Sequence, residues 1–481
     1  MLTKESNERE KTTLSKHALT AVPETEAANG AELRDATFAS LEGQACTEAA
    51  QSLTEAVYEQ GLHRLARAEA EGAAKTNRKK LKLATGAFLA DLLSAKGEWV
   101  YRSLKKDGFT GAPVGARAFI PLQDTMLELG IVEHREGVAE SWVRFDEDGP
   151  PLAARRRASR YRPTGKLIAL AGEYGISLVN ALDHFDYGLP KQPLQKRAAS
   201  TRDAGRKVRG RNIKFEHSVL SQKLEADVRE LNEFLAKQSF GGGCIHRGYV
   251  RIFHNGDASH FNWDQGGRLY SQPANTNYQQ QSGQKRLEMT INGSPVVEID
   301  LRASYLTIFY AWHGMQIDQY EDPYVIPELG LEARDIVKLW VAATFGNTAL
   351  LRKWPSDLLK NYEKDHGHPL DRKRYKVAKL RDKITAHHPI LERWGQAING
   401  RVRTWADLMF AESQVIVGTM VALMKMRAIP SLAVHDSLIV PQEHEDFTCQ
   451  VLNSSYWFHL RALPLIKINR PLKAPQYHKG T

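Results

Sequence analysis

The chain has few cysteines and no long apolar run. Its three cysteines, Cys46, Cys244 and Cys449, lie far apart among 481 residues and show no metal-ligand spacing. This scarcity favours a reducing compartment over a disulfide-stabilised secreted setting. No apolar segment approaches the roughly 20 residues of a membrane-spanning helix, and residues 1–6 contain no apolar core of the kind a signal peptide needs. We therefore expect a cytoplasmic protein without a membrane partner.

Basic residues are in excess. The 66 lysines and arginines exceed the 56 acidic residues and give a formal net charge of +10, although the first sixty or so residues are acidic. The rest of the chain is thus more basic than the total indicates. Such a balance favours a polyanionic partner, and nucleic acid is favoured over a membrane surface because no basic amphipathic anchor is evident.

Composition and periodicity divide the chain into four segments. Residues 1–75 are rich in Ala, Glu, Thr and Ser and are predicted to form a disordered or weakly helical acidic tail. Residues 76–180 show helical periodicity and a hairpin, with helices expected over 83–95, 99–106 and 118–129 and strands over 139–145 and about 158–161. Residues 181–215 are predicted to be a basic linker. Residues 216–481 contain the remaining helices and strands.

Three short helices followed by a basic hairpin resemble a winged helix-turn-helix. In that fold the third helix enters the DNA major groove and the wing contacts backbone phosphates. Arg155, Arg156 and Arg157, at the hairpin tip, would suit such a wing. A small helical domain with a charged loop explains the pattern equally well. The basic linker could add phosphate contacts beside a nucleic-acid site, but a linker needs no such function.

Two apolar runs, far apart in the sequence, each deliver one aspartate. Residues 296–300 (Val-Val-Glu-Ile-Asp) end at Asp300, and residues 432–440 carry Asp436 between two apolar stretches. A lone buried carboxylate is unfavourable unless it is paired or binds a metal. Two carboxylates presented from rigid strands suit a two-metal phosphoryl-transfer site. Taken alone, Asp300 would be explained as the cap of a following helix.

A helix between these runs offers two cations. Arg334 and Lys338 are four residues apart and therefore share one helix face, and the helix ends at the aromatic-glycine pair Phe345-Gly346. Two cations on one face suit the phosphates of a nucleotide. An ordinary amphipathic helix would also place them together.

The order of these motifs resembles the family A DNA polymerases, the DNA polymerase I class. The resemblance covers residues 266–481 and rests on Gly267-Arg268-Leu269 before the palm, residues 296–300 as the first catalytic motif, residues 334–346 as the fingers helix, and Val434-His435-Asp436 as the third motif. Ser437 departs from the Glu that usually follows, and it gives the His-Asp-Ser version of single-subunit phage RNA polymerases. The chain thus resembles a divergent phage or mobile-element type.

The resemblance implies an α+β right-hand fold, with an antiparallel palm sheet, helical fingers and a reduced thumb. It implies that Asp300 and Asp436, with the Leu301 carbonyl, hold two Mg²⁺ ions, with Mn²⁺ as an alternative. The implied nucleotide-binding residues are Arg334, Lys338, Phe345 and Tyr305, and the implied primer-template residues are Arg268, Gln414 and His435. Phe345 follows Lys338 by seven positions, where the family usually has Tyr at eight. Tyr305 stands five residues after Asp300, where a bulky group blocks a ribose 2′-hydroxyl, so deoxynucleotides are the expected substrates.

We therefore expect a template-directed DNA polymerase that extends a primer 3′-hydroxyl with dNTPs. No proofreading exonuclease is expected, because the region before residue 241 lacks a set of acidic ligands on strands. A single-subunit RNA polymerase or primase is an alternative, motivated by Ser437. A third alternative is an inactive polymerase-like replication regulator, against which the intact Asp300, Asp436 and Lys338 argue.

Overall fold

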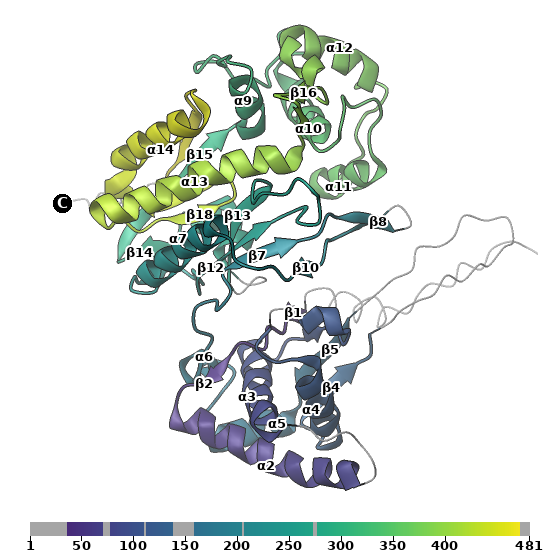
Figure 1. The fold of residues 1–481 in the computed structure, drawn as a ribbon, viewed down its shortest axis with the longest axis vertical. Helices are drawn as coiled ribbons and strands as arrows, with labels where there is room; N and C mark the ends of the chain where they lie inside the picture. Colours follow the sequence, from purple (N-terminus) through teal and green to yellow (C-terminus); the bar gives the residue numbers. More distant parts are fainter. Residues whose placement is uncertain are drawn as a thin grey trace, which may run out of the picture.

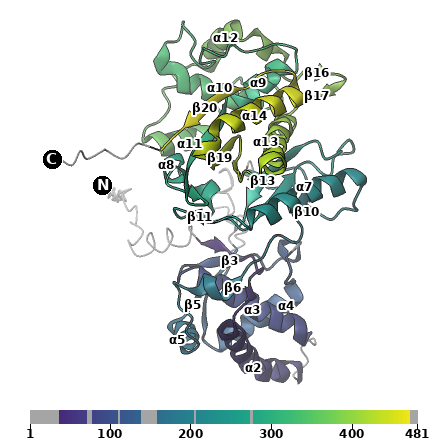
Figure 2. The ribbon, with the colours of Figure 1, turned by 90° about the vertical axis from the view of Figure 1, so that its left-hand side faces the viewer.

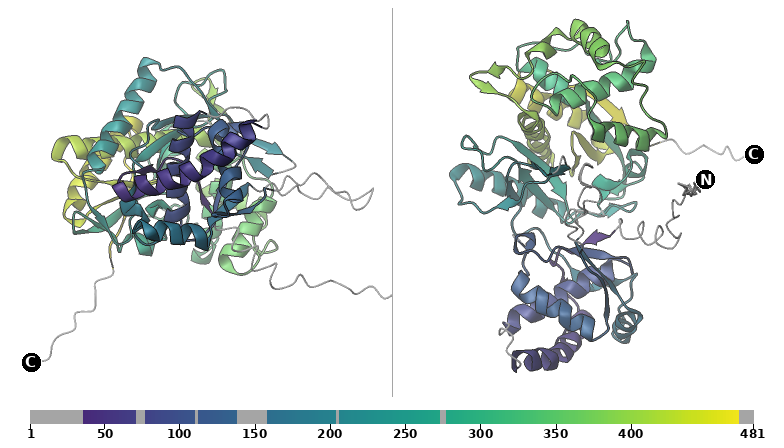
Figure 3. Two further views of the ribbon diagram at one scale, coloured as in Figure 1. Left: turned by 90° about the horizontal axis from the view of Figure 1, so that it is seen from below. Right: turned by 90° about the vertical axis from the view of Figure 1, so that its right-hand side faces the viewer.

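The computed structural model describes residues 36–70, 77–109, 112–137, 158–203, 206–272 and 277–471. These residues form two bodies, each with its own hydrophobic core (Figure 1). The same division is visible in Figure 2 and in the right-hand view of Figure 3.

The N-terminal body combines helices with a four-stranded sheet of order β1-β3-β5-β4. Its elements are β1 (Thr37–Phe38), β2 (Gln44–Ala45), α2 (Glu48–Ala70), α3 (Arg78–Ser94), β3 (Val100–Arg102), the 3₁₀ turn η1 (Lys106–Phe109), α4 (Ala116–Glu128), β4 (Val132–Arg135), β5 (Ser159–Pro163), α5 (Gly165–Glu173), α6 (Ala181–His184) and β6 (Phe185–Asp186). The side chain of Thr164 caps α5 by accepting a hydrogen bond from the Leu167 amide.

One prediction for this body is confirmed in part and another is wrong. The weak helix expected in the N-terminal segment is present as α2, and it is part of the folded body, since Ala50, Leu53 and Val57 lie in the core and α2 packs on α3. A helix expected over 99–106 is instead β3 followed by η1. Pairing of β3 with both β1 and β5 overrides its local helix propensity. The predicted strand over 139–145 and the three wing arginines lie outside the described residues.

The larger body contains two large sheets, the two-stranded sheets β8-β9 and β16-β17, and most of the described helices. Its elements are β7 (Leu194–Arg197), β8 (Thr201–Asp203), β9 (Arg206–Val208), β10 (Asn212–Ile213), α7 (Val219–Leu235), β11 (Phe240–Gly241), β12 (Tyr249–Phe253), β13 (Gly266–Ser271), η2 (Tyr278–Gln280), α8 (Gly283–Arg286), β14 (Thr290–Ile291), β15 (Ser294–Arg302), α9 (Ser304–Ala311), η3 (Leu331–Ala333), α10 (Arg334–Phe345), α11 (Ser356–His366), α12 (Val377–His387), η4 (Pro389–Arg393), β16 (Ala397–Ile398), β17 (Arg401–Val402), α13 (Trp405–Arg427), β18 (Leu432–Val434), β19 (Ser437–Pro441), η5 (Gln442–His444), α14 (Glu445–Leu460) and β20 (Leu465–Asn469).

Part of the predicted basic linker is sheet rather than linker. Strands β7 and β10 belong to the sheet of order β10-β7-β12-β13, in which β7 runs parallel to β12. Leu194 is buried at the start of β7, and the rest of the strand is polar. The apolar alternation that would have marked a strand is therefore absent, and the strand forms through its pairing with β12.

The second sheet has the order β11-β14-β15-β19-β18, and β20 pairs with the other edge of β15. Strand β15 thus lies between β19 and β20 and is antiparallel to both. Val296, Val297 and Ile299 are fully buried because both faces of the strand are covered. This central position makes β15 a rigid support for the residues that it carries.

Helix α13 is the long helix that crosses the larger body in Figure 1. Thr404 and Asp407 form a capping box at its N-terminus. Among the described helices α13 alone is long and apolar enough to cross a membrane, but most of it is buried inside the protein and it carries the buried acidic residues Asp407 and Glu412. These features are those of a core helix.

Candidate active site

Asp300 lies inside β15 rather than at its end. The strand continues to Arg302 because β20 extends the pairing, with Asp300 opposite Ser437 on one side and Lys467 on the other. The expected helix then follows: Ala303 adopts a left-handed conformation (φ 50°) and α9 begins at Ser304. The carboxylate is therefore fixed by two neighbouring strands.

Asp436 lies in the two-residue turn between β18 and β19. His435, the first residue of the turn, has a φ of 55°, a conformation that few side chains adopt but that is enriched in histidine. The backbone amide of Leu301 donates a hydrogen bond to the backbone carbonyl of Asp436 at 3.1 Å. This bond fastens the turn directly to β15, beside Asp300.

The outer edge of β18 is closed by side chains from elsewhere in the fold. The backbone amide of Ala433 donates a hydrogen bond to the Tyr249 hydroxyl at 2.9 Å. The backbone carbonyl of Ala433 accepts one from the Tyr278 hydroxyl and one from the side-chain amide of Gln279, at 2.8 Å each. The two tyrosine hydroxyls lie 2.6 Å apart. The hairpin that carries Asp436 is therefore held on both sides.

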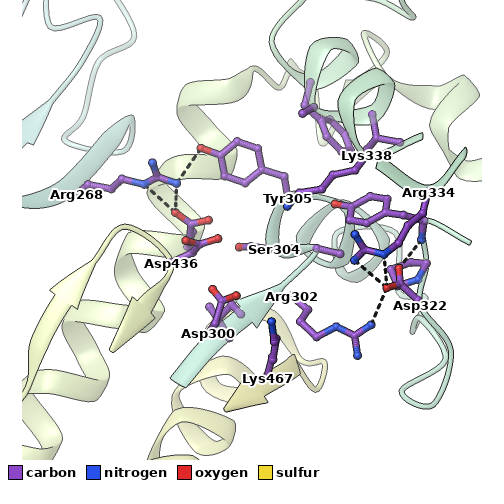
Figure 4. Close-up of a pocket in the computed structure, with 18 residues that line it drawn as sticks. Arg268, Asp300, Arg302, Ser304, Tyr305, Asp322, Arg334, Lys338, Asp436 and Lys467 are labelled. Atoms are coloured by element: carbon purple, nitrogen blue, oxygen red, sulfur yellow. Dashed lines mark hydrogen bonds and ion pairs between the residues drawn. The ribbon is translucent and has the colours of Figure 1, made fainter. Parts of the chain in front are cut away.

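Asp300 and Asp436 lie side by side (Figure 4). Among the described residues, they alone line both of two adjacent cavities. The first, here called the Tyr305 cavity, has a volume of about 520 Å³ and extends toward α10. The second, here called the His435 cavity, has a volume of about 450 Å³ and extends toward α8. A reaction at this carboxylate pair could therefore bring together two substrates, one from each side.

The two carboxylates are electrostatically unsatisfied. Within the described part of the chain, neither side chain has a hydrogen-bond or ion-pair partner, whereas the buried carboxylates of Glu298, Glu412 and Asp407 all pair with arginines. Burial, and then the charge of Asp436, raise the pKa of Asp300 from 3.8 to about 6. Lys467 and Lys338 oppose this rise. Facing carboxylates without partners fit a cation, which would relieve their repulsion.

The number of ligands fits Mg²⁺ bound together with substrate. No group of three or more His, Cys, Asp or Glu side chains in the described residues is arranged to hold a metal ion. Mg²⁺ is commonly bound by one or two carboxylates, with water and substrate phosphates completing its shell. Leu301, whose carbonyl was expected to take part, lines the Tyr305 cavity together with both aspartates.

Arg334 and Lys338 both line the Tyr305 cavity from α10. Lys338 is exposed there. Arg334 instead pairs with Asp322, to which its Nε donates at 2.8 Å, and Arg302 also lies 3.3 Å from that carboxylate. Asp322 therefore neutralises Arg334 and Arg302, two of the cations that border the cavity. The sequence pattern did not indicate this role for Asp322.

Tyr305 and Arg268 stand beside the aspartates on the α13 side of the Tyr305 cavity. The Arg268 guanidinium donates to the Tyr305 hydroxyl at 3.4 Å and, through Nε, to Glu412 at 2.8 Å. Burial raises the pKa of Glu412 to about 7, although the charge of Arg268 opposes the rise. Arg268 is therefore placed near the site but is already paired within the protein.

Two predicted contact residues have other partners. Phe345 is 1% exposed, and its ring packs against Phe309 and Trp394 with centroids 5.6 and 4.9 Å away. The ring borders the Tyr305 cavity but is not free to stack on a base, because Trp394 covers it. Gln414 accepts a hydrogen bond from the buried Arg251 at 2.6 Å, so it is not simply an exposed polar residue.

The structure places His435 as an exposed residue at the His435 cavity. Arg155, Arg156 and Arg157 lie outside the described residues. Sequence reasoning missed Arg286 and the role of Glu298, which form a buried ion pair on the wall of the His435 cavity. One signal was present: Glu298 precedes Asp300 by two residues, which places both on one face of a strand.

Comparisons with known proteins add little. No protein-family model matches the chain, and no curated protein matches its sequence. Among solved structures it is similar to the POL domain of Pol1 from M. smegmatis, in complex with DNA primer-template and dNTP, with a TM-score of 0.29 and 12% sequence identity. The alignment covers 64% of this chain and 55% of that one, so the chain spans little more than half of the domain's length. The likeness to a polymerase domain is therefore partial.

Proposed function

We propose that the larger body is a nucleotidyltransferase of the DNA polymerase type, which extends a primer 3′-hydroxyl with dNTPs on a template. The observation that carries this proposal is the unpartnered pair Asp300 and Asp436 at the junction of two cavities, with Lys338 and Arg334 bordering one of them. A triphosphate in the Tyr305 cavity and a primer end in the His435 cavity would meet at this pair.

The residues would divide the work by position. Asp300 and Asp436 would hold Mg²⁺, which in such sites activates the attacking hydroxyl and stabilises the leaving pyrophosphate. Lys338 would neutralise charge that develops on the phosphates, and Arg334 would do so after exchanging Asp322 for a phosphate. Tyr305, beside Arg268, would lie against the sugar and disfavour a ribose 2′-hydroxyl.

Primer extension tests the proposal directly. The wild-type chain should extend a primed DNA template in the presence of Mg²⁺, and Asp300→Asn and Asp436→Asn should each lower the rate by at least about 100-fold, more than the loss of an outer partner usually does. A wild-type chain that extends neither primed nor unprimed templates, or aspartate variants that remain active, would refute it. Parallel reactions with dNTPs and rNTPs separate a DNA polymerase from an RNA polymerase or primase.

We also propose that the N-terminal body is a winged-helix DNA-binding unit. Its support is the order α3, β3, α4, β4, β5 with β5 between the other two strands. Exposed charges on α4 include Arg117 but also Asp124 and Glu128, which does not favour a helix inserted among phosphates. The basic tip at residues 155–157 is thus the expected contact. Replacing all three arginines with alanine should weaken binding to duplex DNA and lower its salt slope by about 3. An unchanged slope would contradict this.

A further inference from the structure

Glu298 is a buried carboxylate on the wall of the His435 cavity. It lies on β15 two residues before Asp300 and is 5% exposed. Arg286 donates two hydrogen bonds to it, from Nε at 3.1 Å and from Nη2 at 2.8 Å. The Ser437 hydroxyl lies 2.7 Å from the same carboxylate. Three donors from two other segments therefore converge on Glu298.

These contacts connect the wall of the cavity to the turn that carries Asp436. Ser437 follows Asp436 directly and is 2% exposed, and its hydroxyl also lies 3.1 Å from the Val434 carbonyl at the start of the turn. At the other end, Nη1 of Arg286 donates to the Gln281 carbonyl at 2.6 Å. The Ser437 hydroxyl has a single proton, and the shorter distance favours its donation to Glu298 over the Val434 carbonyl. A continuous set of hydrogen bonds thus runs from the segment before α8, through Glu298, to the residue that directly follows Asp436.

Glu298 is not placed as a further metal ligand. Its carboxylate receives three hydrogen bonds, and the described residues contain no group of three acidic or histidine side chains arranged around a metal. Stability alone does not account for the pair either, since a buried ion pair is seldom better than apolar side chains of similar volume. What the pair does supply is a fixed acceptor for the Ser437 hydroxyl.

We infer that Glu298 is a positioning residue which, through Ser437, fixes the turn that presents Asp436 to a metal ion at Asp300. Arg286 holds the Glu298 carboxylate in place through two hydrogen bonds. The family that the chain resembles usually has a glutamate directly after Asp436, and this chain has Ser437 there. The Glu298 carboxylate contacts the same turn from the neighbouring strand β15. The inference rests on the proposed function in one respect: the metal ion at Asp300 and Asp436 is taken to serve nucleotidyl transfer.

Binding of Mn²⁺ to the full chain, measured by electron paramagnetic resonance, tests the inference without requiring activity. Glu298→Gln and Ser437→Ala should each weaken Mn²⁺ binding by about 10-fold, the lower end of the effect of losing a partner behind a metal ligand. The double variant should also lose about 10-fold rather than about 100-fold, because both changes remove the same connection. Ser437→Ala leaves the Arg286–Glu298 pair intact, so it remains informative if Glu298→Gln does not fold.

Asp407→Asn is the matched control. Asp407 is a buried carboxylate bonded to Arg401 and Arg403 at the start of α13, and it lines neither cavity. This variant should lose stability but bind Mn²⁺ like the wild type. In primer extension, Glu298→Gln and Ser437→Ala should lower kcat by about 10-fold and leave the KM for dNTP unchanged, since the Tyr305 cavity is untouched.

Unchanged Mn²⁺ binding in both single variants, or equal weakening by Asp407→Asn, would overturn the inference. So would additive losses in the double variant, because Glu298 would then not act through Ser437. A wild-type chain that binds Mn²⁺ through Asp300 and Asp436 but extends no primer would refute the proposed function, and the Mn²⁺ measurements would still decide the role of Glu298. A chain that binds no Mn²⁺, either alone or together with dNTP, refutes both.

Discussion

Replacing Asp436 with asparagine should abolish catalysis and at the same time stabilise the metal-free protein. Asparagine keeps the shape of the side chain and removes its charge. The pKa of Asp300 is raised from 3.8 to about 6, so ionising Asp300 in the folded protein costs about 3 kcal/mol more than in the unfolded chain. Burial is the largest cause and the charge of Asp436 the second. The charge of Asp436 therefore accounts for only part of this cost, on the order of 1 kcal/mol, which is how strongly two like charges about 4 Å apart repel each other at a high dielectric constant.

The stabilisation should depend on pH with a definite sign. Repulsion between the two carboxylates acts only when Asp300 is ionised. Because the pKa of Asp300 is higher in the folded protein, the cost is absent below about pH 4, develops between pH 4 and 6, and is complete above pH 6. Urea unfolding in EDTA at pH 8 should therefore show Asp436→Asn to be more stable than wild type by about 1 kcal/mol, and the difference should disappear near pH 4.

Asp407→Asn provides the contrast. It removes the same charge from a carboxylate that is paired with Arg401 and Arg403, and it should destabilise the protein by about 3–5 kcal/mol. If Asp436→Asn is less stable than wild type at pH 8, or if its gain is the same at both pH values, the reasoning about unsatisfied charge at the site is wrong.

Three further predictions concern Asp322 and Tyr305 at the Tyr305 cavity and Asp91 in the N-terminal body. Asp322→Asn should raise the affinity for a fluorescent dNTP by roughly 2- to 5-fold in a binding titration, because Arg334 is released from a partly exposed ion pair; weaker binding would mean that Asp322 orients Arg334 instead. Tyr305→Ala should increase rNTP incorporation relative to dNTP by about 10-fold or more in single-nucleotide extension, and an unchanged ratio would remove Tyr305 from sugar selection. Burial raises the pKa of Asp91, in the N-terminal body, to about 7, so wild type should lose stability relative to Asp91→Asn as pH rises from about 4 to 7; a constant difference in urea unfolding would contradict this.

The sequence predicted the parts of the site that depend on local structure. Asp300, Asp436, Arg334 and Lys338 each belong to a short strand, turn or helix whose pattern is complete within about ten residues. Their order along the chain indicated that these parts belong together. The structure places all four around the Tyr305 cavity.

What the sequence could not indicate depends on pairing between distant segments. Glu298 reaches Ser437 only because β15 and β19 pair with Ile299 opposite Leu438 and Asp300 opposite Ser437. Likewise, β15 continues past Asp300 because β20, more than 160 residues later, supplies a partner. Phe345 was expected to bind nucleotide from its place at a helix end, but Trp394, from a later segment, packs against its ring.

The closure of β18 by Tyr249 and Tyr278 has a mechanical consequence. Tyr249 belongs to β12, whose partner β13 carries Arg268, so one set of backbone and hydroxyl hydrogen bonds links the strand beside Arg268 to the strand that precedes Asp436. The two sheets therefore cannot shift against each other at this point without breaking bonds to Ala433. Under the proposed function, a displacement imposed on β12 and β13 by a bound duplex would be transmitted to the turn that carries Asp436 as a rigid movement. Contact with nucleic acid and alignment of the reacting groups would then be adjusted together.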